Sequence, residues 1–384
     1  MKSRIALTCA AAGTVLLLAA CTDNTAPTAG NGVINVTSTD DACTLSTDTT
    51  PGGTLKFNVT NKGTQVTEFY LLAEDRLRII GEVENIGPGL TRDLVVLAPE
   101  GSYYTACKPG MIGDGIQAPF TVSAAPEGQE VSADRAALQK TATDQYASYV
   151  REQTEQLVRG TEEFAQAFTA GDDDKARELY PVVRMHWERI EPVAESFGDL
   201  DPILDAREAD LEAGQEWTGW HRAEKDLWPP QDGYTALTSE ERSALMEKMV
   251  ADTQTLHTRT QELTFTADNL ANGAKELLDE VATGKVTGEE EIWSHTDLWD
   301  FQANLEGAKI AYENLRPLLA GTEDDLDATL EKKFAELQTL LDQYRVGEGF
   351  VYYDKLTTQQ VQELSSAVDA LSEPLSKLTA AVVK

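Results

Sequence analysis

A histidine and a glutamate stand three residues apart in a short segment that begins at Gly219 and ends before Pro229 and Pro230. On a helix, this spacing points His221 and Glu224 from one face, as two ligands of one metal ion would point. Glycine before the segment and prolines after it are typical of a helix that begins and ends here. The alternative is a hydrogen-bonded His–Glu pair on an amphipathic helix, because His-x-x-Glu is a short and common pattern.

Acidic residues recur nearby at the same three-residue spacing. Glu188 and Glu191 form one pair, with Glu195 one turn further on, and Asp205 and Glu208 form another. A bundle that gathers such pairs from two or three helices makes an oxygen-rich site with one imidazole, which suits iron or another borderline-hard cation. In a chain this acidic, each pair could equally lie on a solvated helix face.

Familiar catalytic motifs are missing from the sequence. A zinc peptidase usually places two histidines on one helix turn beside a glutamate, whereas His186, His257 and His295 are each isolated here. The sequence also lacks a Gly-rich phosphate loop, a Gly-x-Ser-x-Gly elbow and a Cys-x-x-Cys pair. These features favour binding over catalysis, with a metallopeptidase as the alternative.

The elements that position these residues belong to a chain of 384 residues, long enough for two domains with real cores. The net charge of −33 argues against nucleic acid as a partner, since binding phosphates needs an excess of Lys and Arg. Residues 1–123 carry 12 acidic against 8 basic residues, and residues 124–384 carry 53 against 24. The acidic second part would attract cations, although solubility alone could explain it.

Residues 1–21 are predicted to be an export signal, with two basic residues followed by an apolar run too short to span a membrane. The run ends in Leu-Ala-Ala-Cys, which resembles a bacterial lipobox whose cysteine, Cys21, carries the lipid; the alternative is a plain secretory signal. Residues 22–31 are predicted to be a flexible tether. The mature protein is therefore expected outside the cytoplasm, lipid-anchored at the cell surface or in the periplasm.

Two cysteines remain after the signal segment, which contains Cys9, and the lipid site are set aside. Cys43 and Cys107 would occupy an oxidising compartment, where a disulfide is the default. The rival interpretation is that one or both thiolates bind a soft metal.

The apolar pattern changes once along the chain. From 32 to 123, short strand-like runs separated by turn clusters predict a β-sandwich of about seven strands. Residues 124–140 are predicted to be a linker, and 141–384 an all-α domain of bundle type. The expected helices lie near 141–169, 172–195, 202–213, 219–228, 238–283, 289–319, 323–345 and 357–383.

The predicted sandwich contains no histidine, which argues against a blue-copper centre. Cysteines, one methionine and acidic residues could instead form a carboxylate-and-sulfur site for oxidised iron or copper. A disulfide with carboxylates on a strand face is the alternative. The residues concerned are Cys43, Cys107, Met111, Glu68, Glu82 and Glu84.

Together, the lipobox, the small sandwich and three long strings in the helical part resemble the EfeO family of iron-uptake proteins. The strings lie at 184–192, 219–225 and 294–304, and the resemblance runs from about Gly32 to the C-terminus. It implies a cupredoxin-like sandwich followed by an imelysin-like helical domain. It also implies iron as the bound metal, ferrous or ferric, with copper or zinc as alternatives, and two partners, a membrane iron permease and a haem peroxidase-like protein.

The resemblance also implies a ligand set. His221 and Glu224 would be joined by Glu191 and Asp205, with Glu188 and Glu208 as further candidates. The family's proposed site in the sandwich falls on Cys43, Cys107, Glu68, Glu82 and Glu84. The proline after Glu191 could bend that helix and turn the carboxylate inward. Arg207 and Arg222 are expected to offset the clustered negative charge, or else to form surface pairs.

Overall fold

The computed structural model describes residues 33–383, apart from 75, 77, 78, 99, 113, 114, 125–132, 212 and 213. The expected signal segment and the lipid-site cysteine, Cys21, therefore lie outside the described residues, as does the tether. Within the described part of the chain, no helix is both long enough and apolar enough to cross a membrane.

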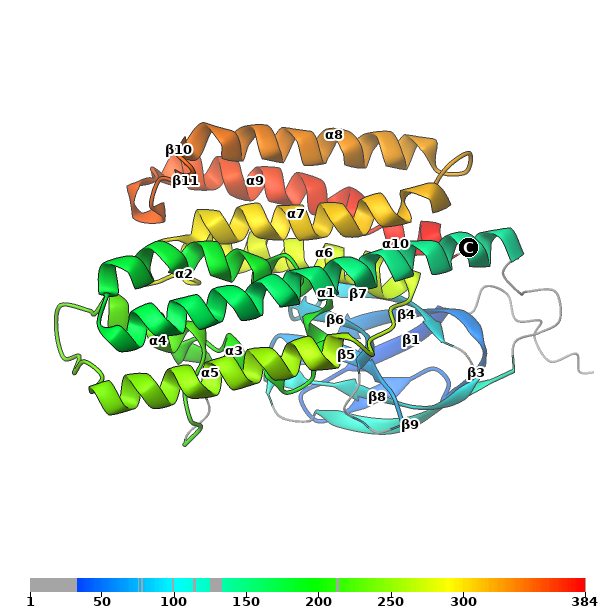
Figure 1. The fold of residues 1–384 in the computed structure, drawn as a ribbon. Helices are drawn as coiled ribbons and strands as arrows, with labels where there is room; N and C mark the ends of the chain where they lie inside the picture. Colours follow the sequence, from blue (N-terminus) through cyan, green and yellow to red (C-terminus); the bar gives the residue numbers. More distant parts are fainter. Residues whose placement is uncertain are drawn as a thin grey trace, which may run out of the picture. The chain divides into compact units, whose positions relative to one another are not determined.

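Strands occupy the first part of the chain, from 33 to 123, and form two sheets with the orders β2-β1-β4-β7 and β3-β9-β8-β5-β6 (Figure 1). Alternate residues of β4 are buried, as expected for a strand with one face on a core. Phe57 of the first sheet packs against Phe69 and Phe120 of the second, with ring centroids 5.1 and 5.6 Å apart. The predicted β-sandwich is therefore confirmed. Its strands are β1 (Val33–Ser38), β2 (Cys43–Leu45), β3 (Thr49–Pro51), β4 (Gly53–Asn61), β5 (Thr67–Leu72), β6 (Ile79–Ile86), β7 (Thr91–Ala98), β8 (Gly101–Cys107) and β9 (Ile116–Ser123).

A disulfide joins the two sheets. Cys43 on β2 is bonded to Cys107 on β8, with the Cα atoms 5.5 Å apart. Cys107 is fully buried in the sandwich core. The prediction that these cysteines lie within bridging reach is confirmed.

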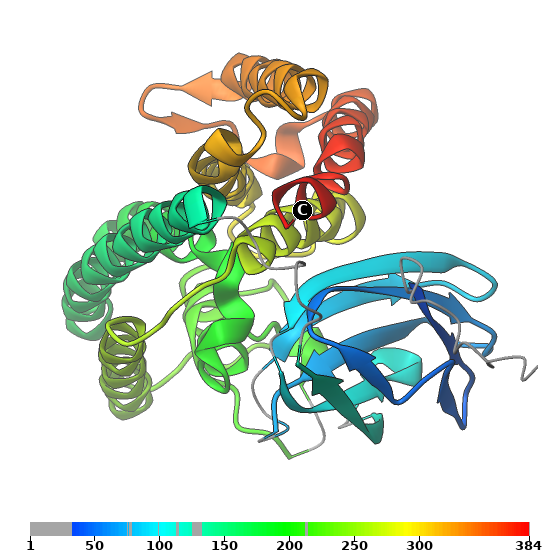
Figure 2. The same ribbon diagram turned by 90° about the vertical axis from the view of Figure 1, so that its right-hand side faces the viewer.

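Helices form the rest of the chain, as predicted (Figures 1 and 2). Helix α1 packs against α2 and α5, α2 packs against α7, and α6 packs against α7 and α9. A short strand pair, β10 (Arg345–Val346) and β11 (Gly349–Phe350), interrupts the helical pattern and was not predicted. The helices are α1 (Ala133–Ala170), α2 (Asp173–Glu188), α3 (Leu200–Leu204), α4 (Trp220–Leu227), α5 (Ser239–Thr260), α6 (Ala267–Thr283), α7 (Asp297–Leu315), α8 (Asp324–Leu341), α9 (Thr358–Leu375) and α10 (Leu378–Val382).

The expected helix over 238–283 is two helices, because each half has its own start signal. Thr238 caps α5 and Thr266 caps α6, and each threonine accepts a hydrogen bond from the backbone N–H three residues later while the side chain of that residue bonds back. The chain between them, 261–266, is not helical. Helix α1 begins at Ala133, so the second half of the expected linker 124–140 belongs to a helix.

Three other expected helices are shorter than predicted. In each case, the residues that are not α-helical contribute to a site. The helix expected at 172–195 ends at Glu188 and is followed by a 3-10 helix, η2 (Glu191–Phe197), with Pro192 in its first turn. Of the expected 202–213, only α3 (Leu200–Leu204) is an α-helix, with a short 3-10 turn after it. The helix expected at 289–319 begins at Asp297, which leaves 289–296 as turns.

Helix α6 connects the two parts of the molecule. Its Asn269 side chain donates to the carbonyl oxygen of Ile80 on β6 at 3.0 Å, and Asn272 donates to that of Val95 on β7 at 2.9 Å. The other side of α6 packs against α7, α9 and η2. Helix α6 therefore contacts both the sandwich and elements that carry acidic residues (Figure 2).

Candidate metal centre

The paired residues His221 and Glu224 lie on α4, and both side chains are fully buried. Gly219 precedes α4 with a φ of +83°, and a Cβ there would lie 2.1 Å from the carbonyl oxygen of Leu204. Only glycine therefore lets the start of α4 approach the end of α3 so closely. This contact brings Asp205, the residue after α3, next to His221.

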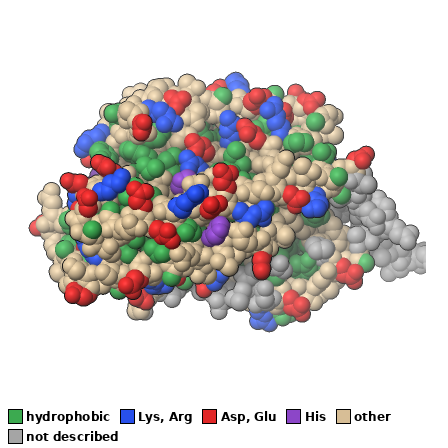
Figure 3. Space-filling model, in the orientation of Figure 1, with side chains coloured by type: hydrophobic (Ala, Val, Ile, Leu, Met, Phe, Trp, Pro, Cys, Tyr) green, Lys and Arg blue, Asp and Glu red, His purple; other side chains and the backbone are tan. Residues whose placement is uncertain are grey.

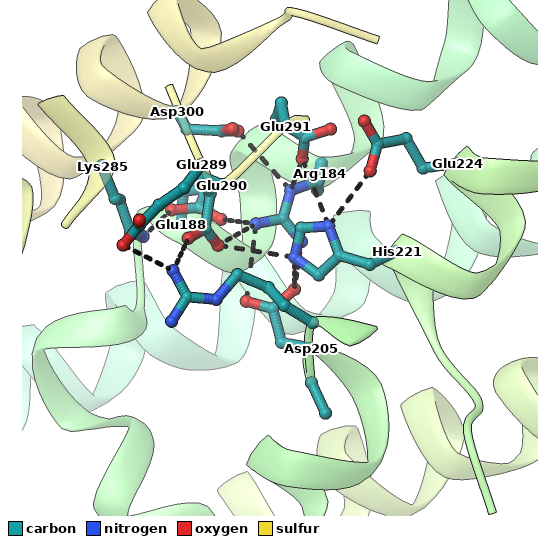
Figure 4. Close-up of polar contacts among 12 residues, drawn as sticks. Arg184, Glu188, Asp205, His221, Glu224, Lys285, Glu289, Glu290, Glu291 and Asp300 are labelled. Atoms are coloured by element: carbon teal, nitrogen blue, oxygen red, sulfur yellow. Dashed lines mark hydrogen bonds and ion pairs between the residues drawn. The ribbon is translucent and has the colours of Figure 1, made fainter. Parts of the chain in front are cut away.

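The His221 imidazole lies between carboxylates on both sides (Figure 4). Its Nδ1 atom is 3.3 Å from Glu224 Oε2 and 4.0 Å from Glu291 Oε1. Its Nε2 atom is 3.4 Å from both Asp205 Oδ1 and Glu290 Oε1, without hydrogen-bond geometry to any described residue. Two groups of ligand atoms with mutual distances within 4.8 Å result, one on each side of the ring.

The turns at 289–296 fix the orientation of Glu224. Its Oε1 atom accepts hydrogen bonds from the backbone N–H groups of Trp293 and Ser294, at 2.9 and 2.7 Å. Its Oε2 atom faces His221 Nδ1. Both oxygens of Glu224 are therefore engaged, which holds the imidazole with Nε2 towards Asp205 and Glu290.

A buried arginine lies at the centre of the carboxylates (Figure 4). The guanidinium of Arg184, on α2, has no exposed surface and contacts five carboxylates, one on its own helix and four on other segments. The partners are Glu188, Asp205, Glu290 at 3.1 Å, Glu291 at 2.6 Å and Asp300 at 3.6 Å. A cation built into the chain thus offsets part of the negative charge.

A second buried cation lies on the other side of this cluster. Lys285 Nζ is 2.8 Å from Glu188 Oε2 and 2.8 Å from both oxygens of Glu191. The side-chain amide of Asn304 donates to the same two carboxylates at 2.8 and 2.7 Å. Glu188 and Glu191 are therefore satisfied by the chain's own donors.

Burial lowers the pKa of His221, and so does the neighbouring Arg184. Contacts with Asp205, Glu224 and Glu290 outweigh both effects and raise the pKa of His221 well above its ordinary value. Without a metal, the imidazole therefore carries a proton, and a metal ion that binds Nε2 must displace it.

Carboxyl groups behind Arg184 also lack partners. Neither oxygen of Asp300, nor Oδ2 of Asp297, has a hydrogen-bond partner among the described residues. Burial first, and then the nearby negative charge of Glu188, raises the pKa of Asp300 well above its usual range; burial raises the pKa of Asp297 to about 7. The centre therefore holds more carboxylates than its own cations balance, and an added cation would relieve that imbalance.

Comparisons with known proteins identify the family of this chain. The sequence model of the imelysin family, which carries a peptidase name, matches residues 142–378. An Efem/EfeO family lipoprotein of Staphylococcus haemolyticus is 44% identical over 248 residues, which are 64% of this chain and 84% of that protein. The iron uptake system component EfeO of Escherichia coli is 36% identical over 348 residues, which are 90% of each chain. The chain belongs to the EfeO family.

Of the ligands that the family resemblance implied, Glu224 and Asp205 both lie next to His221, in separate groups on the two sides of its imidazole ring. Glu191 lies beside this group but faces Lys285, and Glu188 contacts both buried cations. The proline after Glu191 does turn that carboxylate inward, although towards a lysine rather than towards the imidazole.

Three other expected residues lie at the surface of the site. Glu208 is half exposed and pairs with Lys225. Arg207 contacts Asp210 at 2.8 Å and reaches Glu290 at 3.5 Å, and Arg222 stacks over an indole ring rather than on a carboxylate. Most of the charge compensation expected from these arginines comes instead from Arg184 and Lys285.

Glu290, Glu291 and Arg184 were missed by the sequence reasoning. The run of three glutamates at 289–291 was assigned to a helix, where it would have been a solvated face. The signal that could have separated it is the polar segment Ser294 to Thr296 just before α7, since such residues favour helix starts over helix interiors.

The five residues expected to form a site in the sandwich fall into two groups, a disulfide and three carboxylates on a strand face, which is the alternative that the sequence left open. Cys107 pairs with Phe69 in the sheet and shares its inward face, and its sulfur is bonded to Cys43. Tyr70 pairs with Glu82, so these two side chains, one residue along from Phe69 and Val83, lie on the outward face. Glu68 and Glu84 occupy alternate positions on that outward face too. Sulfur and carboxylates are therefore separated by the sheet.

Proposed function

We propose that this protein is a lipid-anchored extracytoplasmic component of an iron uptake system, which binds an iron ion at the His221 cluster and passes it to a membrane permease. The observation that carries the proposal is the buried imidazole whose Nε2 atom lies 3.4 Å from each of two carboxylates. The relatives' names support the pathway, since one is called an iron uptake system component and another a lipoprotein.

In this proposal iron is the cargo, and His221 Nε2, Asp205 and Glu290 are its ligands. Oxygen ligands with one imidazole suit ferrous or ferric iron better than copper(I). Glu224 acts as a positioning residue, because its oxygens are held by backbone N–H groups and by Nδ1. This revises the ligand set implied by the resemblance, in which Glu224 itself bound the metal.

Access to the ion supports transport as the role. Asp205 and Glu290 also line a cavity of about 650 Å³, so these two proposed iron ligands face open space. An ion could enter and leave on that side without unfolding of the bundle. Three protein ligands leave coordination positions for water, as a protein that hands its ion on would need.

Calorimetric titration with ferrous iron under anaerobic conditions tests the site. His221→Ala, Asp205→Asn and Glu290→Gln should each weaken binding at least about tenfold, with little change in melting temperature for the two isosteric variants. His257→Ala is the matched control, because His257 on α5 bonds Thr154 on α1. Unchanged iron affinity in His221→Ala would overturn the proposal.

A metallopeptidase remains the second candidate, because the matching family carries a peptidase name. A general base needs a free oxygen near the attacked water, whereas both oxygens of Glu224 are engaged. Incubation of the metal-loaded protein with a peptide library separates the two functions. Cleavage that disappears in Glu224→Gln would replace the transport role by catalysis.

The anchor has its own test, although Cys21 lies outside the described residues. Cys21→Ser should release the protein from membranes, because a lipidated cysteine is the membrane attachment that the sequence predicts. Fractionation after a salt wash measures this, and a variant that still sediments with membranes contradicts the lipobox interpretation.

A further inference from the structure

Three glutamates from different elements meet where the sandwich and the helices join. Glu82 is on β6, Glu195 on η2 and Glu276 on α6. Each offers one carboxylate oxygen to a group in which these atoms lie within 4.8 Å of one another. Carboxylates this close repel one another unless protons or a cation separate them.

The described cations form no ion pair with this group, although the charge of Lys275 acts to lower the pKa of Glu276. No ion pair of the described residues involves Glu82, Glu195 or Glu276, whereas Glu188 and Glu191 have Lys285. Lys275, next to Glu276 in sequence, pairs with Asp279 instead at 2.7 Å. The group therefore differs from the His221 cluster, where Arg184 is built in.

An orphaned buried atom points to a ligand here. Glu82 is only 5% exposed, and its Oε2 atom has no hydrogen-bond partner among the described residues. An unpaired buried carboxylate oxygen destabilises the fold, and a bound cation would remove this penalty. Burial raises the pKa of Glu82 to about 7 and that of Glu276 to about 8.

The backbone holds the three elements tightly around the group. Gly273, one turn before Glu276, lies so close to η2 that a Cβ would sit 1.7 Å from the carbonyl oxygen of Pro192. Asn269, on the same helix, bonds the β6 backbone at Ile80. The three carboxylates are thus brought together by packing rather than by flexible side chains on an open surface.

The group also shares a cavity with the main centre. The same cavity of about 650 Å³ is lined by Glu82, Glu195 and Glu276 at one part and by Asp205 and Glu290 at another. Further acidic residues, Glu84, Asp201 and Glu280, line it as well. By contrast, acidic and basic side chains are interspersed on the outer face in Figure 3, so this cavity concentrates negative charge.

We propose that Glu82, Glu195 and Glu276 form a second cation site, which takes an oxygen-preferring divalent ion such as Mn²⁺ or Fe²⁺ and shares its cavity with the His221 cluster. Three carboxylates without nitrogen or sulfur select hard cations. Binding here does not depend on the iron-uptake role. If that role holds, the two sites mark successive positions of an ion within one cavity.

Equilibrium dialysis of the full chain with Mn²⁺, counted by electron paramagnetic resonance, tests this site. We expect the wild type to bind two ions per chain. Glu82→Gln and Glu276→Gln should each keep one of these ions and bind the second ion at least about tenfold more weakly. His221→Ala should lose the ion at the His221 cluster and keep the ion at the three glutamates. Glu280→Gln is the matched control, because it removes one charge from the same cavity and helix without touching the three glutamates.

Two results would overturn the site. One is a wild-type stoichiometry and affinity in both Glu82→Gln and Glu276→Gln. The other is an equal loss in Glu280→Gln, which would mean that cavity charge alone attracts the ion. Melting temperatures without metal show whether each variant folds. If a variant does not fold, anomalous scattering from wild-type crystals grown with Mn²⁺ locates the ion. Either failure leaves the ferrous titration of His221→Ala as an independent test of the proposed function.

Discussion

Replacement of Arg184 by methionine tests whether the centre is short of positive charge. Methionine keeps most of the apolar stem but removes the guanidinium that contacts five carboxylates, with no exposed surface at either Arg184 or Glu188. Breaking a buried ion pair costs about 3 to 5 kcal/mol because an uncompensated charge remains. We therefore expect the metal-free variant to lose about 3 to 5 kcal/mol of unfolding free energy.

A bound cation should restore much of this loss. An ion present at 100 times its dissociation constant stabilises the folded state by about 2.7 kcal/mol. Without Arg184, the same carboxylates bind the ion more tightly, so the stabilisation by Mn²⁺ or Fe²⁺ should be larger in the variant than in the wild type. Urea denaturation followed by tryptophan fluorescence, with and without the ion, measures both quantities.

Arg189→Met is the matched control for Arg184→Met. Arg189 follows the same helix and pairs with Glu306 at 2.8 Å, but it is partly exposed. Such a pair contributes about 0 to 1 kcal/mol, and the response to metal should stay that of the wild type. If the two variants lose equal stability, or if the metal stabilises Arg184→Met no more than the wild type, Arg184 is not the charge that the centre requires.

Gly219→Ala should lower stability by more than Gly171→Ala and weaken metal binding as well, because both positions have positive φ but only Gly219 would clash with neighbouring backbone; thermal denaturation and ferrous titration compare them. Burial lowers the pKa of His186 to about 4, while the unfolded chain binds that proton near 6.5. Stability should therefore fall by about 1 to 2 kcal/mol, after allowance for solvent screening, as the pH drops from about 6.5 to 4, and His186→Gln should flatten this part of the urea-denaturation profile; equal profiles would contradict the shift. Reduction of the Cys43–Cys107 bond, 64 residues apart, should cost about 4 kcal/mol in denaturation experiments and leave ferrous binding at His221 unchanged, whereas lost binding would contradict the separation of sulfur from the metal centre.

The sandwich and the helical domain could be predicted because their signals are local. Alternation along β4 and the change to helical periods after the strands are properties of neighbouring residues. The breaks within predicted helices were missed because the start signals at Thr266 and Asp297 lie inside segments that remain rich in helix formers.

The site was predictable only in part, for a related reason. The spacing of His221 and Glu224 is a local signal, and Asp205 was a candidate from its spacing with Glu208 and from the family resemblance. Whether Glu191 faces the imidazole or Lys285 depends on a residue 94 positions away, which no periodicity reveals. The role of Arg184 is equally hard to predict, since four of its five partners lie on other segments of the chain.

The hydrogen bonds from α6 to the sandwich protect the edges of its two sheets. Strands β6 and β7 are the outermost strands of their two sheets, so each offers unpaired backbone groups on one side. Asn269 and Asn272 occupy carbonyl oxygens of these strands, and the helix covers the place where another strand would add. A sandwich expressed without α6 would present open edges and tend to associate edge to edge. We therefore expect helix α6 to prevent edge-to-edge association of the sandwich strands.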